Sequence, residues 1–375
     1  MESLKALIAA GGTAGHINPG LAIADKIKAV FPKSEIIFLG TPYGLESLLV
    51  PKAGYGFFPI KMSGLQRRIS LKNIAHNFKA LYYYTVAKGE AKKLIKSFMP
   101  DIVIGTGGYV SAPAIKAAAA LGIKTAAHES NSLPGISTKM LSKVANKVFI
   151  ADEGAIKYIP AKEKCVVTGN PVRQNLKLLP KSEALKSLGL PSGFTILSFG
   201  GSLGANKITE CVAKLLKWEQ EAGEINHIHA YGKNGKNIFF DLLKREGIPF
   251  ESNRTLFKEY INNMYTCYAA ADLIISRSGS MTQTELKALG KASIQVPWPG
   301  AAENHQYYNA LSMAKAGACR LIEDKDLTPE NLLSAVKGLY DDKNMLAEME
   351  KNTARLYTYN SADIIMDEIL NLVRS

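Results

Sequence analysis

Short apolar runs, each bounded by glycine, aspartate or proline, alternate along the chain with longer segments whose apolar residues recur at helical spacing. The apolar runs read KALIAA, EIIFLG, DIVIGTGG, IKTAAH and KVFIA in the first half, and FTILSFGG, NHIHAYG, DLIISRSG and ASIQVP in the second. Segments with helical spacing include GLAIADKIKAV, SAPAIKAAAALG, NKITECVAKLLKW and MTQTELKALG. Strands that alternate with helices predict an α/β protein with parallel, doubly wound sheets.

The opening pattern of the chain occurs twice. Residues Ile8–Asp25 read IAAGGTAGHINPGLAIAD and Leu197–Val212 read LSFGGSLGANKITECV, so a strand, a Gly-Gly loop and a helix follow one another in both places. A chain of 375 residues also exceeds what one hydrophobic core usually serves. We therefore predict two Rossmann-like domains, residues 1–165 and 166–345, joined where proline and glycine are frequent. Residues 346–375 are predicted to form a C-terminal helix that can pack back on the first domain.

Composition narrows the choice of partner. Lysine and arginine number 46 against 33 aspartates and glutamates, and the formal net charge of +13 favours an anionic partner such as nucleic acid, a phospholipid surface or a phosphorylated substrate. The four cysteines are far apart and form no C-x-x-C pair, so neither a zinc site nor a disulfide framework is suggested, and a reducing cytosol is expected. No basic-plus-apolar leader and no run of about 18 apolar residues occurs, so we expect a protein that is neither secreted nor membrane-spanning.

Four glycine-rich loops follow predicted strands. The first fails the dinucleotide-binding pattern, because its frame reads Ala10, Gly12, Gly15 and no acidic residue ends the second strand. It also lacks the Lys-Ser or Lys-Thr of a phosphate-binding P-loop. The other three loops read GTGGYVSAP, GGSLGA and SRSGSMTQTE. Each lets the backbone and a helix N-terminus approach an anion, so four of them in two domains predict two phosphorylated ligands that meet in an interdomain cleft.

In order and spacing, these motifs resemble the MurG family of bacterial cell-wall glycosyltransferases. The resemblance runs from Leu7 to about Leu321 and rests on GGTAGHINPG, GTGGYVSAPA, HESNSLPG, TGNPVR, GGSLGA, EYINNM, SRSGSMTQTE and ENHQYYNA. It implies the GT-B fold, in which two Rossmann-like domains face each other across a deep cleft. It also implies an inverting transfer of N-acetylglucosamine from UDP-N-acetylglucosamine to the 4-hydroxyl of the muramoyl sugar of undecaprenyl-diphospho-muramoyl-pentapeptide. This step turns lipid I into lipid II in peptidoglycan synthesis.

The resemblance also assigns residues to the two substrates. For the donor it implies that Ser202 holds the diphosphate, the Ile261 backbone the uracil, Glu285 the ribose hydroxyls and Gln306 the sugar hydroxyls. The helix that begins near Ser280 would stabilise the departing UDP. The rest of the implied donor set is Thr13, Ala14, Gly15, Asn131, Arg173, Arg277, Met281 and Thr282. The acceptor diphosphate would be held by Gly12, Gly15, His16, Gly107, Gly108 and Tyr109.

The sequence departs from the commonest family pattern at Ala14, Ser130, Leu203 and His305. Ala14 takes the place of a usual glycine, and its Cβ is tolerated only if residue 14 avoids a positive φ. Arg173 and Arg277 are consistent with two roles. Each can be an ordinary ion-pair partner or a ligand of the diphosphate.

His16 and Glu285 are the candidate catalytic residues. Transfer to a sugar hydroxyl needs a base for the departing proton, and His16 lies beside a glycine loop and has a near-neutral reference pKa. It can equally hydrogen-bond a loop carbonyl or the acceptor phosphate and only order the site. Glu285 lies in the first turns of a predicted helix, where an acidic residue often merely complements the dipole, although the surrounding motif favours ribose binding. His128, at the end of a buried-looking strand, is expected to be structural.

We expect no metal and no other cofactor. Asp324-Lys325-Asp326 resembles a D-x-D metal motif, but it precedes LTPENLLSAV and is better interpreted as a turn before a helix capped at Thr328. No other carboxylate or His/Cys cluster has the spacing of metal ligands. Loops and helix dipoles are therefore expected to act in place of a cation.

The segment Arg67–Phe98 carries an amphipathic stripe among basic and aromatic residues. Ile74, Phe78 and Leu81 recur at helical spacing, which is most often a core face, but the run Tyr82–Tyr84 cannot face one core entirely. The alternative is peripheral docking on an anionic membrane surface at the cytoplasmic face, near the loops that would receive a polyprenyl diphosphate.

Two rival functions suit parts of this pattern. A nucleotide-sugar epimerase can share the two-domain architecture and the donor site, but it has no use for a second diphosphate loop. An RNA-binding protein would suit the charge of +13, yet base-stacking aromatics on a basic sheet face are not evident. We therefore expect no nucleic-acid partner.

Overall fold

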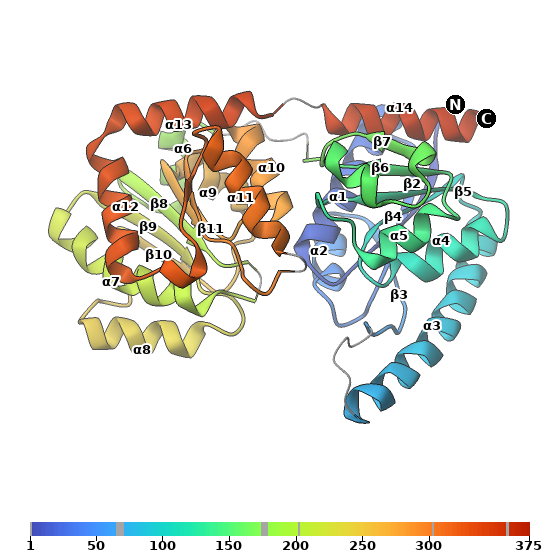
Figure 1. Cartoon of the computed structure of the whole chain (residues 1–375), viewed down its shortest axis with the longest axis horizontal. Coiled ribbons are helices and arrows are strands. Elements are labelled where there is room, and N and C mark those ends of the chain that lie inside the picture. Colours follow the sequence, from blue (N-terminus) through green and yellow to red (C-terminus); the bar gives the residue numbers. More distant parts are fainter. Residues whose placement is uncertain (1, 65–70, 174–178, 202, 302–303, 358–359) are drawn as a thin grey trace. The chain divides into compact units, whose positions relative to one another are not determined.

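The computed structural model describes residues 2–64, 71–173, 179–201, 203–301, 304–357 and 360–375, and for residues 71–76 it describes the backbone only. The chain divides into two compact units. The first comprises Met1–Gln174 with Tyr359–Ser375, and the second comprises Asn175–Thr358. Each unit is a parallel sheet covered by helices on both faces (Figure 1), as the alternation of strands and helices predicts.

Seven strands of the described chain form the sheet of the first unit, in the order β3-β2-β1-β4-β5-β6-β7, with all neighbours parallel. Their bounds are β1 Lys5–Ala10, β2 Glu35–Gly40, β3 Gly56–Pro59, β4 Ile102–Gly107, β5 Lys124–Glu129, β6 Lys147–Ile150 and β7 Cys165–Val167. Both faces of β1 are buried. Ala6 and Ile8 pack into one core and Leu7 and Ala9 into the other, which explains the uninterrupted apolar run.

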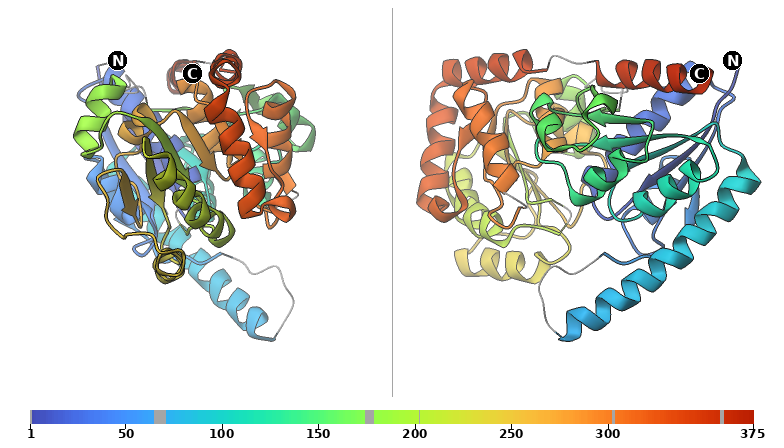
Figure 2. Two further views of the ribbon diagram at one scale, coloured as in Figure 1. Left: turned by 90° about the vertical axis from the view of Figure 1, so that its left-hand side faces the viewer. Right: turned by 45° about the vertical axis from the view of Figure 1, so that its right-hand side comes forward.

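Two helical layers cover this sheet. α1 (Ala14–Val30), α2 (Glu46–Lys52) and α14 (Ser361–Arg374) lie on one face, and α3 (Leu71–Phe98), α4 (Ser111–Ala119) and α5 (Ile136–Ser142) lie on the other. Two short 3₁₀ helices, η1 (Glu153–Tyr158) and η2 (Lys162–Lys164), precede β7. α14, drawn in red, lies beside the blue α1 in two views (Figures 1 and 2), and its Ile365 and Ile369 are buried in the same core as α1.

The second unit repeats the architecture with six described strands in the order β10-β9-β8-β11-β12-β13, again parallel. The strands are β8 Phe194–Phe199, β9 Ile225–Ala230, β10 Thr255–Lys258, β11 Leu273–Ser276, β12 Ser293–Gln295 and β13 Arg320–Leu321. The helices are α6 Lys181–Leu188, α7 Asn206–Ala222, α8 Lys236–Glu246, α9 Met264–Ala270, α10 Ser280–Leu289, α11 His305–Lys315, α12 Pro329–Asp341 and α13 Lys343–Arg355.

The domain limits differ from those expected. The expected boundary after residue 165 falls inside β7, which pairs with β6 of the first sheet. The expected C-terminal helix is divided, because α13 packs on α10 in the second unit and only α14 packs on α1 in the first. Ala14 is the first residue of α1 and therefore has a helical φ, so the Cβ that replaces a usual glycine hydrogen is tolerated.

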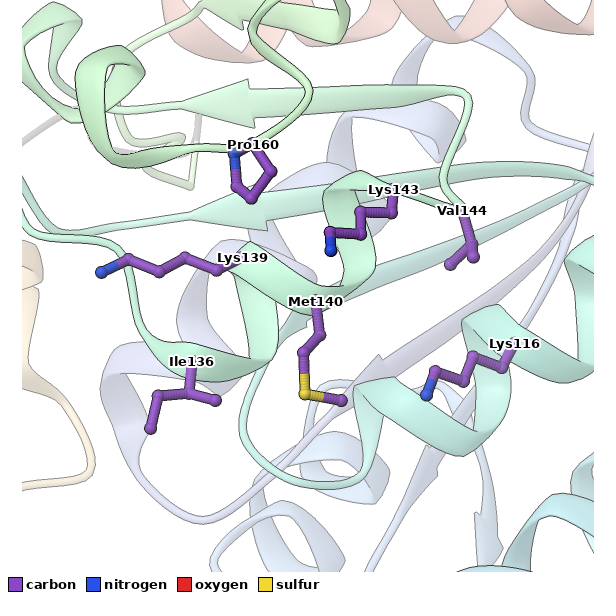
Figure 3. A pocket seen from close by; sticks show the side chains of 7 residues that line it. All are labelled: Lys116, Ile136, Lys139, Met140, Lys143, Val144 and Pro160. Carbon is purple, nitrogen blue, oxygen red and sulfur yellow. The ribbon is translucent and has the colours of Figure 1, made fainter.

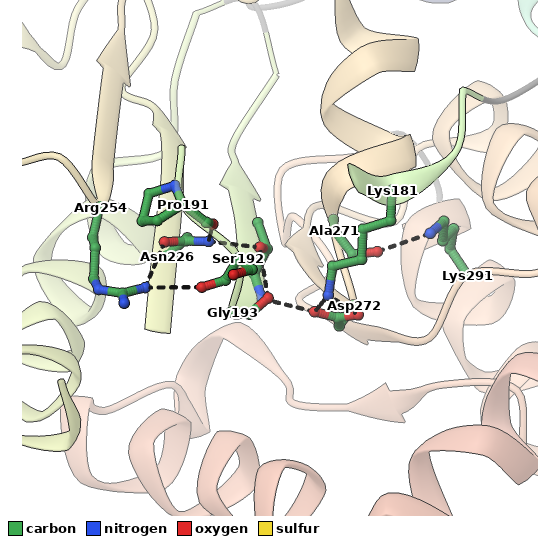
Figure 4. Close-up of polar contacts among 10 residues, drawn as sticks. Lys181, Pro191, Ser192, Gly193, Asn226, Arg254, Ala271, Asp272 and Lys291 are labelled. Carbon is green, nitrogen blue, oxygen red and sulfur yellow. Dashed lines mark hydrogen bonds and ion pairs between the residues drawn. The ribbon is translucent and has the colours of Figure 1, made fainter. Parts of the chain in front are cut away.

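Polar contacts close the amino edge of the second sheet (Figure 4). Asp272, just before β11, pairs with Lys181 at 2.5 Å and accepts the backbone N–H of Thr195 at 2.8 Å. Asn226 donates to the Pro191 carbonyl at 2.8 Å and accepts from Arg254 at 3.1 Å. Since this edge is occupied by structural bonds, the opposite, carboxyl edge is where the unit can present a site.

Candidate functional site

The four glycine-rich loops lie in two pairs, one pair in each unit. β1 has β2 on one side and β4 on the other, and β8 has β9 and β11, so the strand order reverses beside β1 and β8. Ligands of open parallel sheets bind at this position, outside the carboxyl ends of the strands. The loops after β1 and β4 are neighbours there in the first unit, as are the loops after β8 and β11 in the second.

Close packing of the first pair of loops requires glycine. Gly107 has φ 119°, and a Cβ on it would lie 2.2 Å from the Nδ1 atom of His16. Gly108 has φ 76°, and a Cβ there would lie 2.2 Å from the Gly11 carbonyl oxygen. The His16 imidazole therefore packs directly against the loop after β4. The two glycines are needed for this packing, in addition to any contact with a ligand.

His16 lies in the first turn of α1, half-buried, with its backbone carbonyl accepting the Thr106 hydroxyl at 2.7 Å. Its Nδ1 atom is buried and has no hydrogen-bond partner among the described residues. Burial lowers the pKa of His16, while the Glu129 carboxylate, a hydrogen bond with the Thr106 backbone and the Glu46 carboxylate act in the opposite direction. The imidazole is therefore neutral near pH 7, and two carboxylates are placed to stabilise the imidazolium once a proton arrives.

Two buried carboxylates that the sequence analysis did not single out organise this end of the sheet. Glu46, which is completely buried, accepts the backbone N–H and the hydroxyl of Thr41 at 2.9 and 2.6 Å and the backbone N–H of Gly12 at 3.2 Å. Glu46 thus holds the first glycine loop in place through its bond to Gly12. Gly12 is 34 residues from Glu46 in the sequence, so no local pattern reveals this role.

Glu129 organises the loop after β5. It accepts the backbone and side-chain N–H groups of Asn131 at 3.1 and 3.0 Å, the backbone N–H of Gly135 at 3.0 Å and the hydroxyl of Thr138 at 2.6 Å. Neighbouring His128 is buried, and burial lowers its pKa to about 4, which fits a neutral, structural histidine. Asn131 is therefore held by Glu129 next to the His16 loop.

Thr13, Gly12 and Tyr109 complete the rim. Thr13 caps the N-terminus of α1 through its extended backbone and is exposed, as is Gly12, while Gly15 and Tyr109 are half-buried. Burial raises the pKa of Tyr109. Arg173, which follows β7, reaches α1 and contacts the carboxylate of Asp25 on that helix through its Nε atom at 2.5 Å.

In the second unit, Ser202 lies outside the described residues, but the remainder of its loop is described. Gly204 has φ 86°, and a Cβ on it would lie 2.3 Å from the Tyr231 carbonyl oxygen, so this loop too is packed closely against its neighbour. α7 begins just after the loop, at Asn206. Its N-terminus therefore faces the carboxyl edge of the sheet.

Ser280, Met281 and Thr282 form the first turn of α10, and Glu285 follows on the same helix. Glu285 is buried and accepts the hydroxyl of completely buried Tyr268 at 2.9 Å. Burial raises the pKa of Glu285 to about 7, and the Tyr268 hydrogen bond opposes that rise. The structure thus adds Tyr268, which no sequence motif indicated, to the surroundings of Glu285 and of buried Ile261.

Arg277 and Gln306 are already engaged by the protein. Arg277 donates to the carbonyls of Val296 and Pro297 at 3.3 and 3.1 Å and pairs with Asp324. Asp324 also pairs with Lys207, and Thr328 caps α12 as predicted. The Gln306 side-chain oxygen accepts the Trp298 N–H at 3.0 Å. Both arginines of the predicted set are therefore ion-pair partners in the structure.

The described parts of the chain contain no group of three or more His, Cys, Asp or Glu side chains with the arrangement of a metal site. All four cysteines are free. No described helix combines the length and the apolar character needed to cross a bilayer.

Known proteins match the chain almost from end to end. The glycosyltransferase family 28 N-terminal domain matches residues 6–150, and the C-terminal domain of that family matches residues 195–365. The chain is 42% identical over 355 residues to a Desulforamulus reducens protein, with 94% of both chains covered. That relative is named UDP-N-acetylglucosamine–N-acetylmuramyl-(pentapeptide) pyrophosphoryl-undecaprenol N-acetylglucosamine transferase.

Solved structures agree with this match. MurG of Acinetobacter baumannii superposes with a TM-score of 0.68 at 28% identity and covers 98% of this chain and 99% of its own. UDP-N-acetylglucosamine 2-epimerase of Neisseria meningitidis, solved with UDP-N-acetylglucosamine, gives a TM-score of 0.68 over 98% of this chain and all of its own. At 16% identity, the second likeness shows a shared fold alone.

Proposed function

The chain belongs to the MurG family of glycosyltransferases, and we propose that it moves N-acetylglucosamine from UDP-N-acetylglucosamine to lipid-linked muramoyl-pentapeptide, converting lipid I to lipid II. The observation that carries the proposal is the 42% identity, over 94% of both chains, to a relative named for this transfer. A second class of function, epimerisation of the nucleotide sugar, has support from fold likeness alone.

Incubation with UDP-N-acetylglucosamine, with and without a lipid I analogue, tests the proposal. Acceptor-dependent formation of the disaccharide and release of UDP is the expected result. Epimerised sugar in the absence of acceptor would contradict it, and so would salt-dependent retention of RNA without any binding of the nucleotide sugar.

We assign the donor to the carboxyl edge of the second sheet. The N-termini of α7 and α10 supply partial positive charge and backbone N–H groups toward the diphosphate, with the Ser202 loop, Ser280, Met281 and Thr282 around it. Ile261 and Glu285 would hold the nucleoside and Gln306 the sugar. Arg277 is bonded to two backbone carbonyls and to Asp324. We therefore assign it mainly a structural role at this edge of the sheet and only a secondary role in binding phosphate.

We assign the acceptor diphosphate to the paired loops of the first unit, at Gly12, Gly15, His16, Gly107, Gly108 and Tyr109. The first unit would also contribute to the donor site, through Thr13, Ala14, Asn131 and Arg173. In the proposed reaction the muramoyl 4-hydroxyl attacks C1 of N-acetylglucosamine and the bond from C1 to the β-phosphate oxygen breaks. His16 takes the hydroxyl proton, and UDP leaves with its charge facing the helix N-termini.

Glu285→Ala should weaken UDP and UDP-N-acetylglucosamine by the same amount, about 1.5–3 kcal/mol, because the ribose contact of a charged group is common to both ligands. Calorimetric titration of the variant with each ligand measures this. If donor affinity is intact and only the melting temperature falls, Glu285 serves the helix and not the ribose.

We also propose that the first unit docks on an anionic membrane surface, since an undecaprenol-linked acceptor resides in a membrane. α3 supports this. Its core face consists of small or aliphatic residues such as Ala80, Ala87 and Ile95. The predicted core stripe is wrong at Phe78 and Leu81, which are exposed, and the side chain of Ile74 lies outside the described residues. Phe78 and Tyr82 are instead 72% and 65% exposed, next to exposed Lys79 and Lys88. Arg67 and Arg68 lie outside the described residues, as does the side chain of Lys72.

A second apolar and basic surface lies in the same helical layer. A groove of about 420 Å³ runs along α5 (Figure 3) and is lined by Lys116, Ile136, Lys139, Met140, Lys143, Val144 and Pro160. Ile136 and Met140 are 61% and 45% exposed. The Nζ atom of Lys116 lies 5.7 Å from the centroid of the Tyr84 ring on α3. Amphiphilic anions such as phospholipids suit a surface of this kind.

Charge reversal tests the docking. Reversing Lys79 with Lys88, or Lys139 with Lys143, should lower partitioning onto anionic vesicles about 30-fold, at about 1 kcal/mol for each cation removed. Vesicle sedimentation at increasing salt measures it, and binding of soluble UDP should not change. Exposed Lys217 and Lys244 of the second unit form the matched control pair. Equal binding to neutral and anionic vesicles would contradict the proposal.

A further inference from the structure

Tyr268 is a buried residue that is hydrogen-bonded to Glu285 of the proposed donor site. It is completely buried in α9, and its hydroxyl donates to the Oε2 atom of Glu285 at 2.9 Å. Its ring lies 6.4 Å from that of Phe199, the last residue of β8 before the Ser202 loop. It also shares one core cluster with Ile261. Tyr268 therefore contacts Glu285, the proposed ribose ligand, and belongs to the same core cluster as Phe199 and Ile261.

The two carboxylate oxygens of Glu285 have different surroundings. Oε2 is bound by Tyr268, whereas Oε1 makes no hydrogen bond to any residue within the described ranges. A carboxylate fixed through one oxygen has little rotational freedom left, and its other oxygen is available to a ligand. A ribose diol needs this arrangement, because its hydroxyls require an acceptor at a defined position.

We propose that Tyr268 is a positioning residue of the donor site, which orients the Glu285 carboxyl group toward the ribose hydroxyls. The inference rests on the proposed function, in that it takes the donor to be a uridine nucleotide bound at Glu285. Tyr268 itself touches no substrate. Its effect on UDP passes through the Glu285 carboxylate.

The titration of Glu285 supports this role. Burial raises its pKa to about 7, and the donated hydrogen bond from Tyr268 acts in the opposite direction because it stabilises the charged form. The titratable groups placed against Glu285 by the described structure are Tyr268 on α9 and Tyr260 before it, whose own pKa is raised by burial and by Glu285. Removing the Tyr268 hydroxyl should raise the pKa of Glu285 further, so less carboxylate remains at any pH near neutrality.

Titration calorimetry with UDP, from pH 6 to pH 9, tests the inference on four forms of the full chain: wild type, Tyr268→Phe, Glu285→Gln and the double variant. Wild-type affinity should fall as pH decreases through about 7. Tyr268→Phe should bind about three- to tenfold more weakly at pH 7.5, with the midpoint of its pH profile moved to higher pH. Glu285→Gln should lack this midpoint and retain only the titration of UDP itself.

The double variant separates positioning from packing. If Tyr268 acts through Glu285, Tyr268→Phe has no further effect in the Glu285→Gln background. Tyr340→Phe is the matched control, since the Tyr340 ring packs on Phe194 and Trp218 of the same unit without contact to Glu285. An unchanged affinity and pH profile in Tyr268→Phe would overturn the inference, and so would an equal loss in both backgrounds. A wild type that binds no UDP would instead overturn the proposed function.

Discussion

His16→Ala is expected to lower kcat for transfer to the acceptor about 10²–10⁴-fold, the usual loss for a general base, while the affinity for UDP stays within a factor of a few. The structure gives the reason. Burial keeps the His16 ring neutral, and the Glu129 and Glu46 carboxylates favour the imidazolium that forms as the proton is taken. Single-turnover kinetics with a lipid I analogue, beside calorimetry with UDP, measure the two quantities.

The pH dependence has a definite sign. A base works in its deprotonated form, and the pKa of His16 lies below its usual 6.5, so the acid limb of kcat/KM should lie below pH 6.5 and disappear in the variant. His16→Gln separates the two roles considered for this residue. An amide can still order the loop or bind a phosphate, but it cannot accept the proton. If His16→Gln keeps kcat while the KM for acceptor rises, His16 orders the site and another group is the base.

The inner strands were predictable because parallel strands with both faces buried appear as continuous apolar runs. KALIAA, DIVIGTGG and FTILSFGG correspond to β1, β4 and β8. The strands without a predicted apolar run include the four sheet edges, β3, β7, β10 and β13. Each is four residues or fewer and none of their residues is buried, so hydrophobic pattern alone does not reveal them.

The glycine loops were also predictable, because each one directly follows an apolar run in the sequence. The carboxylates beneath them were not. Glu46 is 34 residues from its partner Gly12 and reaches it only because β1 and β2 are neighbours in the sheet. Likewise, no helical spacing in residues 346–375 indicates that α13 stays with the second unit while α14 packs on α1. Contacts of this kind depend on topology, which a local pattern does not contain.

Four buried polar side chains of the second unit form one hydrogen-bonded series. Glu219 on α7 contacts Nδ1 of His227 at 2.8 Å, and Nε2 of His227 lies 2.7 Å from the Ser198 hydroxyl. The same hydroxyl lies 2.7 Å from Nδ1 of His229. All four side chains are at most 4% exposed. Burial lowers the pKa of His229 to about 3, so its ring stays neutral. The hydrogen-bonded series joins α7 to β8 just before the loop that contains Ser202.

Glu219→Ala is therefore expected to destabilise the second unit by about 2–4 kcal/mol, because it leaves the Nδ1 atom of His227 without a partner in the interior and opens a cavity beside it. For a unit of this size the melting temperature should fall by about 4–16 °C. Scanning calorimetry of the full chain measures this, and the transition of the second unit is identified by its rise when UDP is added.

Two matched variants decide whether the buried bond, and not the loss of a negative charge from α7, causes the effect. Glu221→Ala removes the same charge from an exposed position two residues along the helix and should leave the transition unchanged. Glu219→Gln keeps the volume and a neutral acceptor for His227, so it should fall between Glu219→Ala and the wild type. Equal transitions for Glu219→Ala and Glu221→Ala would show that the polar chain adds nothing to stability. If these buried side chains do stabilise β8 and α7, UDP should also bind more weakly to Glu219→Ala than to Glu221→Ala. The reason is that the loop between β8 and α7 is the one proposed to hold the diphosphate.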